Sequence, residues 1–333
     1  AMLHNKTFMS LVIWYCGDCV IVNGFTAFMP KILETILSVS PAVGSYMASV
    51  VILAAATGTI LGGWAISHYK MQVGGMLKFL IICEIASMLF LCNLLISCPP
   101  QQFAGINIGY DLQPVKSANI SNTCNSDCAC TTEWNPVCDN EKGVMFFSAC
   151  AAGCKKKEEE NITMSVTWKD CSCLSYGRPD YDPTQTLTSE YCNTDCGFNL
   201  ILFMVLLFCA VVSTFATFAT HQQIMLRVVP MDHRTIAIGL NWMFLRLFGF
   251  IPGGILFGWI IDKSCLHWGE KCGVAINCLV YDPRKQAMVI FALAIMCKLV
   301  AIIAGVFGYF TYSPSESDQT ASVTTVDSRG PLK

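Results

Sequence analysis

Residues 198–225, FNLILFMVLLFCAVVSTFATFATHQQIM, decide the fold. This run contains no Asp, Glu, Lys or Arg. A helix of about 20 predominantly apolar residues is long enough to cross the hydrocarbon core of a bilayer. The run is therefore predicted to be a transmembrane helix, which places the chain among membrane proteins.

The chain contains five further apolar runs of similar length. They cover residues 8–29, 42–66, 76–97, 235–261 and 287–311. Together, the six runs predict an all-α membrane protein with six transmembrane helices. The first run is too long for a signal peptide and lacks a small-residue cleavage site. Because the chain starts only a few residues before this full-length span, we expect it to be a fragment.

The composition supports the same class of protein. Of the 333 residues, 54% are hydrophobic and 13% are charged, with a mean hydropathy of +0.52, whereas soluble domains carry about 25% charged residues. These values exclude disorder for most of the chain, and also a small disulfide scaffold standing alone. The net charge of -2 gives no reason to expect a nucleic-acid partner. The sequence has no G-x-S-x-G, P-loop or H-E-x-x-H motif, so we expect neither an enzyme nor a cofactor.

The cysteines are concentrated in two loops. Of the 20 cysteines, eleven lie in the polar segment 98–197, and three lie between the fifth and sixth spans. Six spans place these two loops on the same side of the membrane. Clustered loop cysteines indicate disulfides and an oxidising compartment, and sequons at Asn119 and Asn161 indicate glycosylation. We predict a multi-pass plasma-membrane protein with extracellular cysteine-rich loops and cytoplasmic termini.

The number of loop cysteines constrains how they pair. Eleven is odd, and the three in the second loop bring the total to fourteen. If all are oxidised, at least one disulfide must join the two loops or reach a cysteine elsewhere. Metal binding is the alternative use of clustered cysteines, but the sequence lacks the paired C-x2-C spacing of zinc sites. We predict disulfides and no metal.

Ionisable residues within the predicted spans are costly in a bilayer and indicate functional sites. Four of them stand out: Asp18, Glu84, Arg246 and Lys298. Arg246 is the strongest candidate because arginine cannot lose its proton and needs an anionic partner or a wet cavity. Structural alternatives stay open for the others: Asp18 and Lys298 could form an ion pair, and Glu84 could pair with Lys78 or water. Lys31, at the outer end of the first span, could extend to the interface.

Glycines are frequent in the second and fifth spans. They are Gly58, Gly62, Gly63, Gly249, Gly253, Gly254 and Gly258, with Pro252 among them. Such residues permit close helix approach or local bending, and packing alone explains most of them.

Part of the long insert resembles a Kazal domain. The similar residues are Cys130-Thr131-Thr132-Glu133-Trp134-Asn135-Pro136-Val137-Cys138, then Phe146-Phe147-Ser148-Ala149-Cys150 and Cys154. The resemblance implies three disulfides: Cys130 with Cys150, Cys138 with Cys171 or Cys173, and Cys154 with Cys124 or Cys128. In a Kazal inhibitor the loop 131–134 would face a protease. Between two membrane spans, we expect the domain to serve as a rigid extracellular cap.

The chain as a whole resembles the organic anion transporting polypeptide family. The motifs that carry the resemblance are Phe28-Met29-Pro30-Lys31-Ile32-Leu33-Glu34, Gly62-Gly63, Lys70, Arg227-x-x-Pro230, Ala237-x-Gly239, Trp242, Arg246-x-x-Gly249-x-Ile251-Pro252, Phe257-Gly258 and Ile261-Asp262-x-x-Cys265-x-x-Trp268, with Cys272 and Cys278. The resemblance implies a major-facilitator fold, of which these spans would be helices seven to twelve. The first six helices, which would form the other half, are then missing.

The family resemblance also implies a function. It points to sodium-independent transport of amphipathic organic anions by alternating access between two bundles; examples are steroid conjugates, bile salts, thyroid hormones and prostanoids. Arg246 and Lys31 fall where the family carries basic residues that bear on the substrate, so they are predicted to contact the anion. The alternative function is a membrane-anchored protease-inhibitory or binding module.

The expected organisation has four parts. Residues 1–97 would form family helices seven to nine, and 98–197 an extracellular loop with a Kazal-like domain at about 124–173. Residues 198–312 would form helices ten to twelve, and 313–333 a disordered cytoplasmic tail. The expected partners are the organic anion, the lipid bilayer and the missing N-terminal half.

Overall fold

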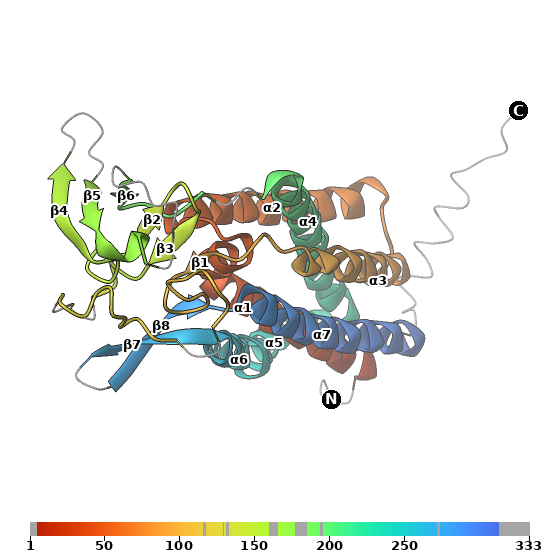
Figure 1. Ribbon diagram of the computed structural model, residues 1–333. Helices are drawn as coiled ribbons and strands as arrows, with labels where there is room; N and C mark the ends of the chain where they lie inside the picture. The colour runs from red at the N-terminus through yellow and green to blue at the C-terminus, as the bar shows by residue number, and fades with distance from the viewer. Residues whose placement is uncertain are drawn as a thin grey trace, which may run out of the picture.

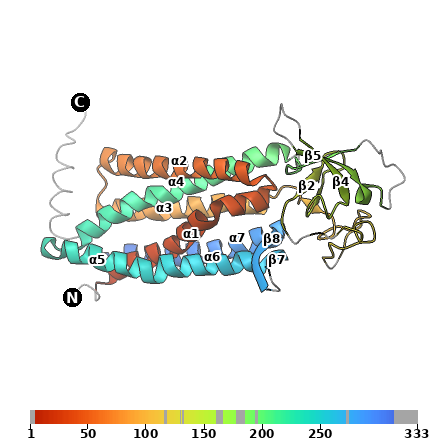
Figure 2. The same ribbon diagram turned by 90° about the vertical axis from the view of Figure 1, so that its left-hand side faces the viewer.

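The computed structural model describes residues 5–115, 118–128, 130, 133–159, 166–176, 185–193, 196–271 and 274–312. The sequon at Asn161, Cys272 and the tail 313–333 lie outside these residues. Six helical segments of the described chain are long and apolar enough to cross a membrane, which confirms the predicted all-α membrane class. They lie side by side, and the β-rich insert covers one end of the bundle (Figures 1 and 2).

The helices correspond to the six predicted spans. The first three are α1 (Lys6–Leu37), α2 (Pro41–His68) and α3 (Val73–Phe90), which a 3-10 turn at Leu91–Leu95 extends. The fourth is α4 (Gly197–Val228) and the sixth is α7 (Pro283–Thr311). The fifth is composite: a 3-10 turn at Met231–His233, α5 (Arg234–Leu245), a π turn at Arg246–Phe250 and α6 (Ile251–Lys263).

Helix α1 is the centre of the bundle. Of its apolar span 67% is buried, against 28–33% for each of the other five. It continues through Pro30 to Leu37, beyond the predicted end at residue 29, because Ile32, Leu33 and Leu37 are all buried in the bundle. The van der Waals contacts of these side chains with the neighbouring helices offset the roughly 3 kcal/mol cost of an interior proline. Ser38, in the left-handed region at φ 54°, then ends the helix.

Glycines bring α2 and α4 into close contact. A Cβ on Gly58 would lie 2.5 Å from the carbonyl oxygen of Val212, and one on Gly62 would lie closer still to that of Ala216. Gly63, the next residue, faces open space. The packing role predicted for these glycines therefore applies to Gly58 and Gly62 at this interface.

The insert folds around a six-stranded sheet. Its strands are β1 (Gln102–Phe103), β2 (Val137–Asp139), β3 (Val144–Phe146), β4 (Cys154–Glu159), β5 (Val166–Cys171) and β6 (Leu187–Thr188). Their order in the sheet is β1-β3-β2-β6-β5-β4, antiparallel except for β1 beside β3. Short strands of this kind expose little edge and bury a small core, so cross-links supply much of the stability.

Six disulfides join the described cysteines. They are Cys98–Cys196, Cys124–Cys173, Cys130–Cys150, Cys138–Cys192, Cys154–Cys171 and Cys265–Cys278. The bond between Cys130 and Cys150 is the one that the Kazal resemblance implies. The cysteines of the spans are free thiols.

The pairing implied for Cys154 is wrong. Cys154 bonds to Cys171 rather than to Cys124 or Cys128. The reason is the register of the sheet, since β4 and β5 are antiparallel with Cys154 and Cys171 directly opposite each other. Cys124 bonds instead to Cys173, which leaves Cys128 as a free thiol.

The pairing implied for Cys138 is also wrong. Cys138 bonds to Cys192 rather than to Cys171 or Cys173. On β2 it lies opposite Thr188 of β6, and the chain that follows β6 brings Cys192 to it. The partner thus comes from outside the segment that resembles a Kazal domain.

A β-hairpin between α6 and α7 packs against the insert. Its strands are β7 (Cys265–Lys271) and β8 (Val274–Tyr281), and the disulfide Cys265–Cys278 closes it. The His267 ring lies edge-on to Phe147 at 5.8 Å, and Val280 joins an apolar cluster of the insert. The two cysteine-rich loops are therefore joined by packing. Among the described residues, no disulfide connects them.

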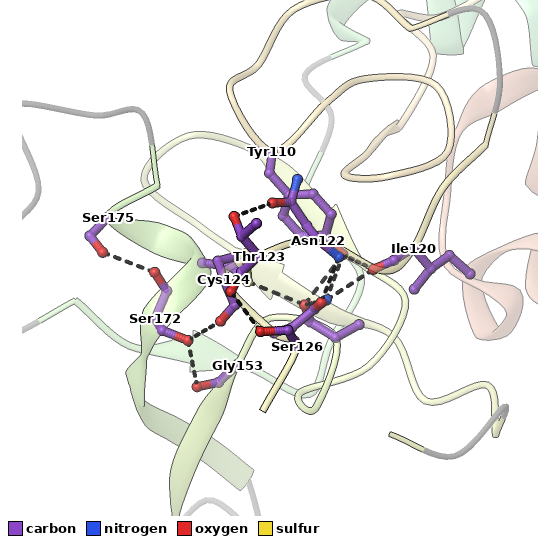
Figure 3. Close-up of a disulfide and its surroundings, with 12 residues drawn as sticks. Tyr110, Ile120, Asn122, Thr123, Cys124, Ser126, Gly153, Ser172 and Ser175 are labelled. Carbon is purple, nitrogen blue, oxygen red and sulfur yellow. Dashed lines mark hydrogen bonds between the residues drawn. A yellow bond between two sulfur atoms is a disulfide. The ribbon is translucent and has the colours of Figure 1, made fainter. Parts of the chain in front are cut away.

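The segment around Cys124 is held by hydrogen bonds as well as by its disulfide (Figure 3). The Ser172 hydroxyl donates to the carbonyl oxygens of Cys124 at 2.6 Å and Gly153 at 3.3 Å. The Tyr110 hydroxyl donates to the carbonyl oxygen of Ile120 at 2.7 Å. Burial raises the pKa of Tyr110 to about 12, so this hydroxyl stays a donor at neutral pH.

We expect the disulfide Cys98–Cys196 to contribute strongly to stability, because it joins the end of the third span to the start of α4 across 98 residues. Serine at both positions should lower the free energy of unfolding by up to about 4.7 kcal/mol, from the chain entropy of such a loop. Thermal unfolding of the purified protein measures the loss. The same change at Cys265 and Cys278, 13 residues apart, should cost less, about 3 kcal/mol. A larger loss in the hairpin variant would contradict this account.

Candidate functional site

Arg246 begins the π turn in the middle of the fifth span. Its neighbours Leu245 and Gly249 are buried against the bundle, whereas the Arg246 side chain is exposed. The same turn exposes Leu247 and Phe248, which are 51% and 60% accessible. Within the described part of the chain, no carboxylate forms an ion pair with Arg246. The turn therefore presents a fixed positive charge among apolar side chains.

Contacts with α1 explain why the helix widens into a π turn at this point. The Asn23 side-chain amide donates to the carbonyl oxygen of Phe250 at 2.7 Å, and the Cys16 thiol lies 3.7 Å from that of Phe244. Gly249 packs so closely that a Cβ there would lie 2.6 Å from the Cβ of Cys19. The π turn is thus anchored to one stretch of α1, and such turns are frequent at functional sites.

Lys31 lies close to the end of α1, below the insert. Its Nζ is 3.0 Å from Glu34 Oε1 and 5.0 Å from the centre of the Tyr281 ring. Burial, and then the charges of Asp262 and Glu34, raise the pKa of Tyr281 to about 12. Lys31 also lines a small cavity of about 50 Å³ beneath the insert, together with Trp134. Its charge is therefore balanced locally.

The structure does not bring Arg246 and Lys31 together. The π turn contacts α1 at Cys16 and Cys19. Lys31 lies twelve residues beyond Cys19, which corresponds to about 18 Å along a helix. One small anionic group cannot contact both cations at once, so the two residues form separate features of the bundle.

A buried ion cluster joins four helices beside this stretch of α1. Lys298 of α7 donates to Asp18 Oδ1 at 2.8 Å, to Glu84 Oε2 at 2.7 Å and to Thr214 Oγ1 at 3.3 Å. The side chains of Lys298, Asp18 and Glu84 are at most 2% exposed. The hydroxyls of Ser87 and Thr214 lie 2.6 Å apart at its edge. The ion pair of Asp18 with Lys298 was one of the alternatives open from the sequence.

The partner of Glu84 differs from the ones considered from the sequence. Glu84 pairs with Lys298 and not with Lys78, which is exposed and lies 5.6 Å from the centre of the Tyr309 ring. Six residues separate Glu84 from Lys78, and at 3.6 residues per turn they point to different sides of α3. Thr214 was also missed, because a threonine in an apolar run is too common to indicate a charged neighbour.

His221 of α4 is fully buried near this cluster. Its ring stacks on Tyr15 at 4.3 Å and lies 5.3 Å from Trp14. No group of three His, Cys, Asp or Glu side chains among the described residues is placed to bind a metal ion.

Comparison with known proteins finds similarity to one protein family. The profile of the Organic Anion Transporter Polypeptide (OATP) family matches residues 1–286. Solute carrier organic anion transporter family member 4A1 of Mus musculus is 30% identical over 321 residues, which are 95% of this chain and 44% of that protein.

Two further relatives show the same coverage. Member 4C1 of Homo sapiens is 30% identical over 324 residues, 95% of this chain and 44% of the relative. Member 6A1 of Homo sapiens is 28% identical over 326 residues, 96% of this chain and 45% of the relative. The chain therefore spans less than half the length of the curated relatives it matches.

Proposed function

This chain belongs to the Organic Anion Transporter Polypeptide (OATP) family of membrane transporters, and from that premise we propose that it serves in the transport of amphipathic organic anions. Steroid conjugates, bile salts, thyroid hormones and prostanoids are the proposed substrates, moved without sodium. The six-helix bundle is consistent with one half of a major-facilitator fold. We propose that a second six-helix half packs against it and that the two halves rock to give alternating access.

The position of Arg246 carries the proposal. A charged side chain in mid-span is tolerated where it faces a water-filled cavity or a partner. Arg246 points away from the bundle, with exposed Leu247 and Phe248 on the same turn. An amphipathic anion needs such a combination: a cation for its acidic group and apolar surface for its body. Lys31 is proposed to act at a separate, outer point of the path.

We propose that the insert is an extracellular cap. The bundle would then lie in the plasma membrane with both termini cytoplasmic, and Asn119 would be open to glycosylation on the outer face, where it is exposed. Trp134 packs on Phe103 and Phe147, at ring distances of 5.7 and 5.1 Å. This packing turns the residue inward instead of toward a protease, which favours the cap over an inhibitor.

Removing the charge of Arg246 tests the proposal. We expect Arg246→Gln to lower uptake of a steroid sulfate, as kcat/KM, by about 10-fold to 100-fold, because a hydrogen bond to a charged group contributes roughly 1.5–3 kcal/mol. Arg246→Lys should retain part of the activity. Uptake is measured in cells expressing the full-length protein and divided by the amount of protein at the surface.

Arg284→Gln is the matched control. Arg284 is also exposed, but it lies in the first turn of α7, far from mid-span. Its loss of charge should leave uptake unchanged. If the Arg246→Gln variant transports normally when as much protein is at the surface as for the wild type, Arg246 does not contact the anion.

A further inference from the structure

We propose that the cluster of Asp18, Glu84 and Lys298 is a proton-binding site that couples transport of the organic anion to movement of one proton. The proposal rests on the proposed function and names the ion that accompanies the substrate. The proton would come from water on the insert side of the bundle, bind a carboxylate oxygen, and return to water on the other side.

The charges of the cluster do not balance. One ammonium group faces two carboxylates, and all three side chains are at most 2% exposed. With both carboxylates ionised, the cluster would bury one uncompensated negative charge, which is strongly unfavourable without solvent. One proton shared between Asp18 and Glu84 makes the cluster neutral, and two such close groups bind it as a pair.

The hydrogen bonds leave a definite place for this proton. Lys298 has three N–H donors, and they go to Asp18, Glu84 and Thr214. The second oxygen of each acid, Asp18 Oδ2 and Glu84 Oε1, is buried without a hydrogen-bond partner among the described residues. A proton on either oxygen removes the excess charge and leaves the three bonds to Lys298 in place.

A small cavity adjoins the cluster. Its volume is about 60 Å³, and its lining residues include Lys298, Thr214 and Met29 of α1. The cavity therefore adjoins the cluster at Lys298 and Thr214, and most of its other lining side chains are apolar.

One stretch of α1 connects the proton site to the proposed anion site. Asp18 lies between Cys16 and Cys19, which both pack against Gly249 of the π turn. A change of charge at Asp18 acts on the backbone that anchors the turn carrying Arg246. Moving one proton with a monovalent anion also transfers no net charge, so the membrane potential does not oppose the entry of the anion.

Other titratable groups face the cluster from the four packed helices. They are Tyr15 and Cys19 on α1, Cys83 on α3, His221 on α4 and Cys297 on α7. His221 is the one whose ordinary titration falls near neutral pH, so it is the main competitor for the role of proton carrier. It stacks on Tyr15 and makes no bond to Lys298.

The experiment measures uptake of a steroid sulfate by the full-length protein in proteoliposomes, over a range of outer pH, with a pH dye trapped inside. For the wild-type protein we expect uptake to rise by up to about tenfold for each unit of outer acidification, the limit for one proton, and the lumen to acidify with substrate entry. Glu84→Gln leaves one ammonium and one carboxylate, which are neutral together. Its uptake should be independent of pH, without acidification.

Exchange of labelled for unlabelled substrate at equal pH shows whether each variant is folded and binds substrate. Asp18→Asn is the second variant and should behave as Glu84→Gln does. His221→Phe should keep the pH dependence of the wild type. Transport by the wild type without acidification, or pH dependence retained in both acid variants, would overturn the proton site alone. Absence of any substrate exchange in the wild type would instead overturn the proposed function.

Discussion

Lys298→Met should destabilise the protein more than any other single change of charge in the bundle. The substitution preserves the length of the side chain and its apolar packing. It leaves Asp18 and Glu84, which are at most 2% exposed, without a cation. Removing one partner of a buried ion pair costs about 3–5 kcal/mol, because the remaining charge is uncompensated. We expect a large fall in the unfolding temperature of the purified protein and in the amount that reaches the cell surface.

Two variants show that the loss comes from the ion cluster. Lys78→Met removes an exposed lysine that lies over the Tyr309 ring, and it should cost about 1 kcal/mol at most. Adding Asp18→Asn and Glu84→Gln to Lys298→Met removes the buried charges altogether and should restore much of the stability. An unfolding temperature that Lys298→Met leaves unchanged would show that this cluster is not buried as described.

Gly62→Val should separate α2 from α4. The added Cβ would meet the carbonyl oxygen of Ala216, an atom of the α4 backbone that cannot turn aside. Forcing extra atoms into a packed interface costs roughly 1–3 kcal/mol and occasionally more, and a backbone contact this close belongs to the upper part of that range. Thermal unfolding in detergent, followed by the fluorescence of the tryptophans, measures the loss.

Gly63→Val is the matched control for this change. It adds the same side chain one position further along the same helix, where nothing lies within 4 Å of the added atom. The two variants share the same change in helix propensity, so the difference in stability between them reports the contact with α4. Equal losses of stability in the two variants would contradict the contact.

The positions of the spans could be predicted from the sequence because the bilayer demands long apolar runs. Their ends could not be predicted in the same way. Pro30 marks an apparent end of the first span, but burial of Ile32 and Leu33 carries α1 on to Leu37. The π turn at Arg246 was also beyond prediction, since it depends on the bond from Asn23 of another helix.

The charged residues could also be predicted only in part. Their cost in a membrane identified Asp18, Glu84, Arg246 and Lys298 as important. Which of them meet depends on how four helices pack, and no spacing along the chain encodes that. The disulfides of the insert depend in a similar way on sheet register, which places Cys138 near Cys192 and so defeats a pairing taken from a smaller domain.

The contact between Asp18 and Lys298 has a consequence for how the protein is synthesised and inserted into the membrane. The two residues are 280 positions apart, and a ribosome adds roughly 5–20 residues each second. Asp18 is therefore synthesised roughly 14–56 s before its cation exists. During that interval α1 must enter the bilayer with the Asp18 side chain protonated, or wait at the insertion machinery for α7. The central helix α1 is thus made before the other five helices described here and is among the last of them to be secured.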